Sequence, residues 1–157
     1  MSDEKTFSLE QMRGAYEHRA LWMYYLSKEH NPVEDGPDGP LHQAIRQCGL
    51  YHAVAKYGAF ESIDKFCEAF ASEPAKSVFE MEIVEKDENT LSVDFHYCPL
   101  VEAWKKLGIE GEELAALCDI AMDGDRGIIE GCGGMNFELP ATIANGDAVC
   151  QIRITTK

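Results

Sequence analysis

Basic residues are scarce in this sequence, and their scarcity excludes one large class of partners. The chain has 14 Lys and Arg residues against 28 Asp and Glu residues, which gives a formal net charge of -14. Nowhere do the basic residues form the cluster that binding to phosphate groups requires. The sequence therefore predicts no nucleic-acid partner and no binding to an anionic membrane surface.

Long apolar runs are also missing. No segment approaches the roughly 18 apolar residues that indicate a membrane-spanning helix, and the acidic first residues, MSDEKTFSLEQ, do not resemble a secretory signal. We therefore expect a cytoplasmic protein. With 45% hydrophobic and 27% charged residues, the composition is that of a globular chain, and the length suits a single domain over residues 1–157.

Closely paired cysteines are absent as well. The six cysteines are Cys48, Cys67, Cys98, Cys118, Cys132 and Cys150. Their wide spacing, without a C-x-x-C pair, predicts free thiols in a reducing compartment and not a disulfide framework. Periodicity places most of them on apolar faces, whereas Cys132 falls in a Gly-rich segment and Cys98 falls at the end of an expected strand.

The first half of the chain has helical periodicity. Ser8 and Gln11 have the spacing of a capping box, which predicts a helix over about residues 8–28. Its second half, ALWMYYL, is apolar nearly all round, so we expect it to run through the core or line a pocket. A Pro- and Gly-rich loop follows, and then residues 41–71 are again helical, with a break expected at Gly58.

The second half changes to the period of two that is typical of strands. The expected elements are a hairpin over residues 79–97, helices over 100–107 and 112–122, an irregular Gly-rich segment over 127–134, and strands around 135–139 and 148–154. The order predicts an α+β fold in which N-terminal helices pack on a mostly antiparallel sheet of about four strands. Residues 8–72 form its helical part, and residues 75–155 form the sheet with two helices inserted after the central hairpin.

Cys98 is the first candidate for chemistry. Alternation in the second hairpin strand places His96 on the same face, so the imidazole is predicted to hold Cys98 as a thiolate. A polar strand face that carries an incidental thiol is the alternative.

Cys118, Asp119 and Asp123 form the second candidate. The two carboxylates share a face near the end of the expected helix, where the helix dipole disfavours negative charge. A substrate cation would offset that charge, and pairing with Arg126 or a role in a turn are the structural alternatives. A zinc site built from Cys98, Cys118, Cys150 and His96 remains open, although the spacing identifies no metal and no cofactor.

Several short motifs together resemble a known family. They are His96-Tyr97-Cys98-Pro99-Leu100, Gly108, Leu117-Cys118-Asp119, Asp123, and the segment 139–150 with Ala144-Asn145-Gly146-Asp147 and Cys150. Over about residues 79–154 they resemble the L-2-amino-thiazoline-4-carboxylic acid hydrolase family. The resemblance implies hydrolytic opening of a cyclic amidine to a carbamoyl-cysteine, and it matches residues Cys98, Cys118, Asp119, Asp123, Asp147 and Cys150.

Three functions follow as hypotheses. The first is a hydrolase acting on a small-molecule amidine, with candidate catalytic residues Cys98, His96, Cys118, Asp119 and Asp123. The second is a module that binds or senses a small molecule without reacting with it. The third is a metal-thiolate protein. Assembly into homo-oligomers is left open.

Overall fold

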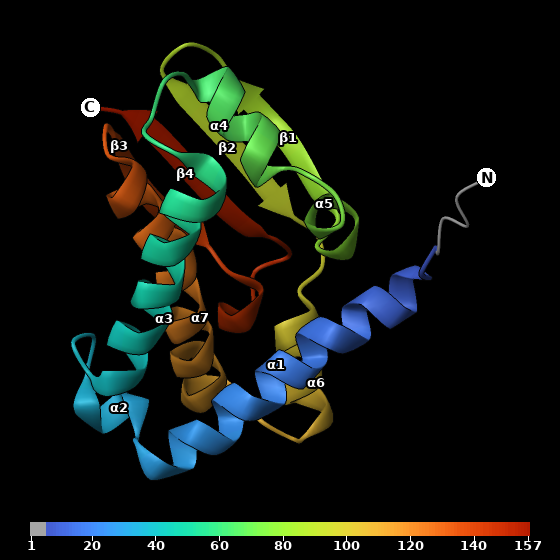
Figure 1. The fold of residues 1–157 in the computed structure, drawn as a ribbon. Coiled ribbons are helices and arrows are strands. Elements are labelled where there is room, and N and C mark those ends of the chain that lie inside the picture. Colours follow the sequence, from blue (N-terminus) through green and yellow to red (C-terminus); the bar gives the residue numbers. More distant parts are fainter. Residues whose placement is uncertain (1–5) are drawn as a thin grey trace.

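The computed structural model describes residues 6–157 (Figure 1). Its first helix, α1 (Leu9–Glu29), begins as predicted, because the Gln11 amide donates to Ser8 Oγ over 3.1 Å and the Ser8 amide donates to Gln11 Oε1 over 2.9 Å. The prediction that its second half runs through the core is wrong. Trp22 is 65% exposed, because α1 buries only a narrow stripe that includes Ala20 and Met23.

The rest of the helical half is a series of shorter elements. They are α2 (Pro32–Asp35), α3 (Pro40–His52), the π-helical turn η1 (Ala53–Tyr57), α4 (Ile63–Phe70) and α5 (Ala75–Val78). The break predicted at Gly58 is present: Gly58 has φ of 78°, a conformation that favours glycine, and it ends η1.

An antiparallel sheet of four strands forms the second layer, as predicted. Its strands are β1 (Met81–Lys86), β2 (Thr90–Phe95), β3 (Met135–Ala141) and β4 (Cys150–Thr156), in the order β1-β2-β4-β3. The last strand lies between the hairpin and β3, with Phe95 opposite Cys150 in the register. Consequently the end of β2, which leads to Cys98, lies beside the beginning of β4.

Two helices are inserted between the hairpin and β3, namely α6 (Pro99–Lys106) and α7 (Gly111–Cys132). The second helix, α7, continues ten residues beyond Met122, where the sequence predicts its end. Its glycines explain the difference, because they allow α3 to pack closely: a Cβ atom on Gly127 would overlap the Arg46 carbonyl oxygen, and one on Gly49 would overlap that of Gly124. Tertiary packing therefore continues the helix where local propensity predicts a turn.

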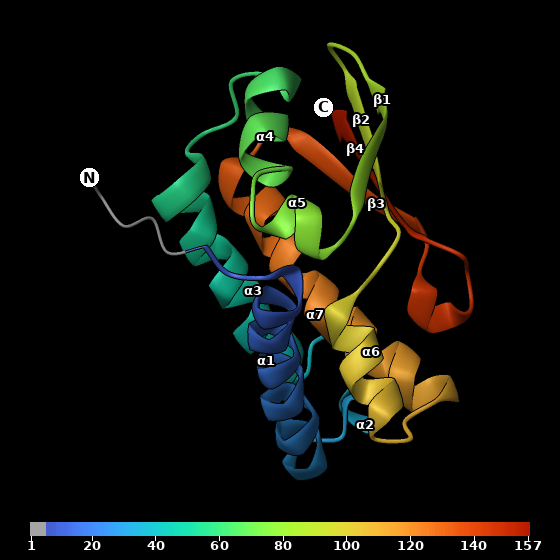
Figure 2. The same cartoon turned by 90° about the vertical axis from the view of Figure 1, so that its right-hand side faces the viewer.

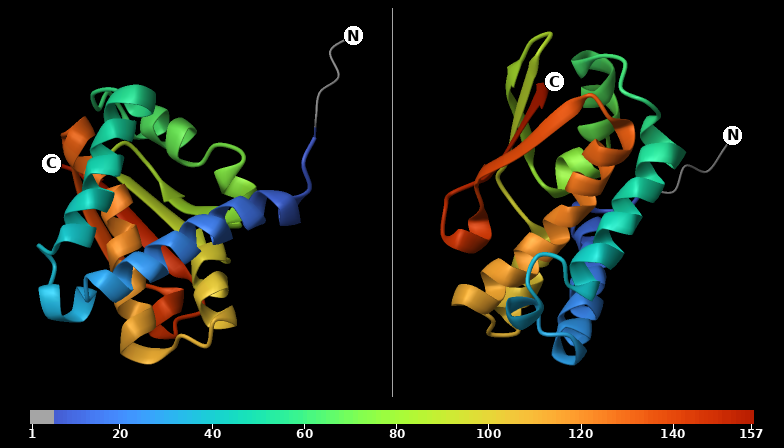
Figure 3. Two further views of the ribbon diagram at one scale, coloured as in Figure 1. Left: turned by 60° about the horizontal axis from the view of Figure 1, so that its bottom comes forward. Right: turned by 90° about the vertical axis from the view of Figure 1, so that its left-hand side faces the viewer.

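The helices cover one face of the sheet and leave the other to solvent (Figures 2 and 3). Under the helices, one apolar cluster joins α4, the end of α7 and the inner face of the sheet, including Val93 and Ile152. A second cluster joins α1, α6 and the beginning of α7, and there the Trp104 indole donates to the Ala20 carbonyl over 2.9 Å. Met122 packs against both clusters, which places the middle of α7 at their junction.

Candidate functional site

Three of the six thiols gather where the two apolar clusters meet. Cys98 is the N-cap residue of α6, Cys118 lies on the inward stripe of α7, and Cys150 begins β4. Burial is the main cause of the raised pKa of Cys118, and the charges of Cys150 and Cys98 raise it further. The fold therefore brings together thiols that are up to 52 positions apart in the sequence.

The predicted thiolate state of Cys98 is wrong for the free protein. Burial raises the pKa of Cys98 to about 11, and the nearby backbone amides of Val101 and Leu100 lower it only in part. The pKa of Cys118 rises to about 12 for the same main reason. At neutral pH both residues are neutral thiols.

His96 does not stabilise Cys98. Its Nε2 atom lies 2.8 Å from Glu82 Oε2, and its side chain is 43% exposed. The predicted alternation places His96 correctly on the polar face of the strand, but the chain leaves the strand after Phe95 and takes Cys98 into the interior. The thiol and the imidazole therefore belong to different environments.

Asp119 and Asp123 belong to an ion-pair network in the middle of α7. Arg126 holds both: its Nη2 donates to Asp119 Oδ1 over 2.7 Å, and its Nη1 donates to Asp123 Oδ1 over 2.8 Å. Asp123 is 1% exposed, and its other oxygen lies 2.8 Å from Nδ1 of His42 and 3.6 Å from Nη2 of Arg46. The predicted position at a helix end is therefore wrong, because α7 continues to Cys132, whereas pairing with Arg126, the structural alternative, is present.

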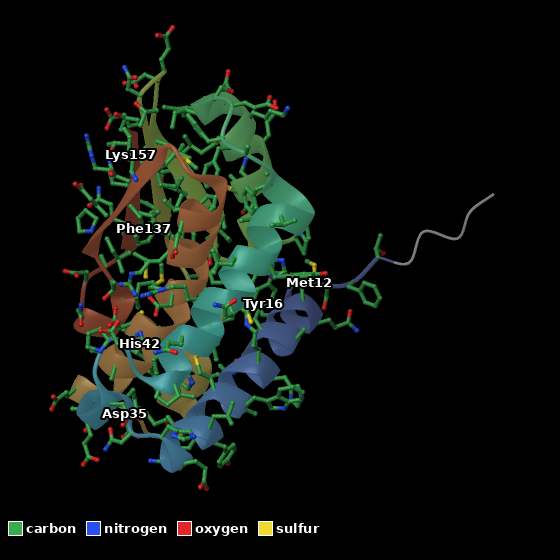
Figure 4. The ribbon with its side chains drawn as sticks, turned by 60° about the vertical axis from the view of Figure 1, so that its left-hand side comes forward. Met12, Tyr16, Asp35, His42, Phe137 and Lys157 are labelled. Atoms are coloured by element: carbon green, nitrogen blue, oxygen red, sulfur yellow. The ribbon has the colours of Figure 1, made fainter. Side chains whose placement is uncertain are left out.

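The partners from α3 were missed by reasoning from the sequence. His42 and Arg46 are four residues apart, which places them on one face of a helix, but their carboxylate partner is about 80 residues away along the chain. Figure 4 shows His42 on the side of α3 that meets α7. The network joins these two helices beside their glycine contact.

Two further residues of the family motifs, Asp147 and Cys150, stabilise the turn before β4. The Asp147 carboxylate accepts a hydrogen bond from the Thr142 amide over 3.0 Å, and Cys150 Sγ accepts one from the Ile143 amide over 3.3 Å. Asp147 therefore stabilises the turn that carries the chain into Cys150.

The remaining thiols lie elsewhere. Cys67 is buried as predicted. Cys48 is exposed and not buried, because it lies on the face of α3 turned away from α7, and Cys132 is the buried last residue of α7 and not part of a loose segment.

A surface hollow of about 460 Å³ lies away from Cys98, Cys118 and Cys150. Its lining comes from the beginning of α4 and the β1–β2 turn, and includes Ile63, Asp64 and Lys86. Within residues 6–157, no group of three or more His, Cys, Asp or Glu side chains is placed to hold a metal ion. None of the helices described is long and apolar enough to cross a membrane.

The fold and the site define a class: a two-layer α+β protein with neutral thiols in its interior and an ion-pair network along its central helix. The sequence of residues 69–154 matches the L-2-amino-thiazoline-4-carboxylic acid hydrolase family over more than half of the chain. The chain belongs to this family, as the motifs around Cys98, Cys118 and Cys150 predict. No curated protein sequence matches the chain.

Solved structures with a similar fold include one particular complex subunit. It is subunit 3 of a trafficking protein particle complex from Naegleria fowleri, covalently bound to palmitic acid. The similarity has a TM-score of 0.62 at 17% sequence identity, and it covers 91% of this chain and 95% of that one. At this identity the likeness concerns the fold alone.

Proposed function

We propose that the protein is a hydrolase that opens a small cyclic amidine, of the kind that 2-amino-thiazoline-4-carboxylate represents, to a carbamoyl-cysteine. Membership of the family carries the proposal. The gathering of Cys98, Cys118 and Cys150 supports it, because these thiols come from separate parts of the matched region and meet at the junction of the apolar clusters.

In this proposal the substrate ring lies against Cys98, and water is the attacking group. A neutral thiol is a poor nucleophile, and the pKa of about 11 keeps Cys98 protonated. The exposed Arg19 is close enough for its charge to lower the pKa of Cys98, and it offers a cation for the substrate carboxylate. His96 has no part in the reaction.

Asp119 and Asp123 act as positioning residues in the proposal. Both hold Arg126, whose charge lowers the pKa of Cys118. They thereby fix a cation beside the thiols and do not touch the substrate themselves.

The test is incubation of the purified protein with 2-amino-thiazoline-4-carboxylate, followed by mass spectrometry for the product with one added water. We expect enzyme-dependent formation of carbamoyl-cysteine. Cys98→Ser should retain activity within about tenfold, with its main effect on KM, since the residue contacts the ring without attacking it. Absence of turnover by the wild-type protein would contradict the proposed function, and complete loss in Cys98→Ser would contradict attack by water.

Binding of an apolar acyl chain without hydrolysis is the second candidate. It is favoured by the similar fold of the Naegleria fowleri subunit, which is covalently bound to palmitic acid, and by the apolar surroundings of the thiols. Intact-mass analysis of the freshly purified protein distinguishes the two. An acyl adduct that hydroxylamine removes, together with no turnover of the amidine, would favour acyl binding.

A further inference from the structure

Asp125 occupies an unusual place for a carboxylate. It is seven residues, or two turns, after Cys118 on α7, so both side chains lie on the inward face of the helix. Met122 and Ile129 lie on the same face of α7, one before and one after Asp125, and both pack in the apolar clusters. The sequence suggested a turn at this position, and the continuous helix instead directs the carboxylate towards the sheet.

Asp125 also differs from its two acidic neighbours on α7 in its partners. Asp119 and Asp123 are both held by Arg126. Within the region that the structure describes, Asp125 forms neither a hydrogen bond nor an ion pair. The side chain of Asp125 is partly buried, and a carboxylate that lies on the inward face of a helix without a protein partner is a feature of functional sites.

The charged and titratable groups around Asp125 come from four elements. Burial raises the pKa of Asp125 to about 6, and Arg19 of α1 and Arg126 of α7 lower it. Its charge in turn raises the pKa of Tyr57 in η1 and of Cys150 in β4, after burial as the main cause in each. Cys118 lies two turns before Asp125 on the same face of α7, and the charge of Asp125 acts on Cys150 of β4, so the carboxylate faces the interior region that holds these two thiols.

We propose that Asp125 is the general base and acid of the amidine hydrolysis, an inference that rests on the proposed function. For the neutral amidine, the oxygen of water forms a bond to the amidine carbon and one water proton passes to the Asp125 carboxylate. The carbon–sulfur bond of the ring breaks with its electron pair on sulfur, and Asp125 returns the proton there. The second water proton goes to the ring nitrogen, so one water is consumed and Asp125 is restored.

The pH dependence of kcat/KM follows from the ionisation state that Asp125 must have at the start of the reaction. The base must be ionised, so kcat/KM should rise with pH through about 6 and then level off. Asp125→Asn should lower kcat by about 100-fold or more and abolish the rise near pH 6. Glu130→Gln is the matched control, since Glu130 lies on the same helix and is exposed, and it should retain wild-type kinetics.

A stability measurement tests the placement of Asp125 independently of activity. The folded state raises the pKa of Asp125 above its ordinary value of 3.8, so ionisation opposes folding, fully above about pH 6 and not at all below about pH 4. Asp125→Asn should therefore have a higher Tm than the wild type at pH 8 and an equal Tm at pH 4. A lower Tm at pH 8 would make Asp125 a structural residue and overturn the inference.

Different results would contradict the proposed hydrolase function and the proposed role of Asp125. If the wild type opens the amidine and Asp125→Asn does so at the same rate, the role of Asp125 is wrong and the proposed function stands. If the wild type does not open the amidine although the Tm of Asp125→Asn behaves as expected, the assigned reaction is wrong, and with it the role of Asp125 as its acid and base.

Discussion

The six cysteine thiols differ in their exposure to solvent. Cys48 is exposed, whereas Cys98 is in part enclosed and has a pKa of about 11, which leaves roughly one thiolate in ten thousand at pH 7. We expect iodoacetamide to modify Cys48 first at pH 7, as peptide mass spectrometry would show. Cys48→Ala should remove the fast phase. A fast phase that persists in Cys48→Ala and maps to Cys98 would contradict this assignment.

The two carboxylates held by Arg126 should contribute very differently to stability. Asp123 is buried against two arginines and the His42 imidazole, and removing one member of such a group costs about 3–5 kcal/mol. Asp119 is half exposed, and such a pair contributes at most about 1 kcal/mol.

Urea unfolding of Asp123→Asn and Asp119→Asn at pH 7 measures this difference. We expect a loss of about 3 kcal/mol in the free energy of unfolding for Asp123→Asn and less than about 1 kcal/mol for Asp119→Asn. Equal losses for the two variants would show that burial of Asp123 does not set its contribution.

At the scale of elements, the contact between α3 and α7 depends on glycine. Gly127→Ala places a methyl group against the Arg46 carbonyl oxygen, and overpacking of this kind costs about 1–3 kcal/mol. Gly14→Ala is the control, because a Cβ atom at Gly14 of α1 meets nothing within 4 Å and alanine favours a helix by up to about 1 kcal/mol. Thermal unfolding should show a lower Tm for Gly127→Ala and an unchanged or higher Tm for Gly14→Ala.

The elements that the sequence predicts well are those whose signals are local. The capping box at Ser8, the break at Gly58 and the alternation of the hairpin all act within a few residues. The sequence predicts the end of α7 too early, because Gly124 and Gly127 favour a turn locally. Only the close packing of α3 reverses that preference.

The sequence predicts which residues belong to the candidate site, but it does not predict which of them contact one another. The family motifs single out Cys98, Cys118 and Cys150, and the fold gathers them. The sequence carries no signal that Asp123 meets His42, because the two lie 81 positions apart. Likewise, the raised pKa of Cys98 follows from burial, which depends on the whole fold.

For the whole molecule, the two apolar clusters should unfold together. They share Phe79, Met122 and Ile143 as partly buried contacts, so loss of one cluster exposes part of the other. We expect a single cooperative transition in urea.

Circular dichroism and the fluorescence of Trp104 in a Trp22→Phe variant measure that transition. Trp104 is fully buried in the cluster of α1 and α6, and the circular dichroism reports all the helices. The two curves should coincide. Separate midpoints would show that residues 1–157 contain two cooperative units.

The central position of α7 also has a consequence for local opening. This helix contacts α1, α3, α6, η1 and β3, so its middle amides cannot reach solvent while its neighbours remain in place. In deuterated buffer they should exchange more slowly than those of α1, and at a rate set by global unfolding. The segment that carries Cys118, Asp123 and Asp125 would then be the last part of the chain to take up deuterium.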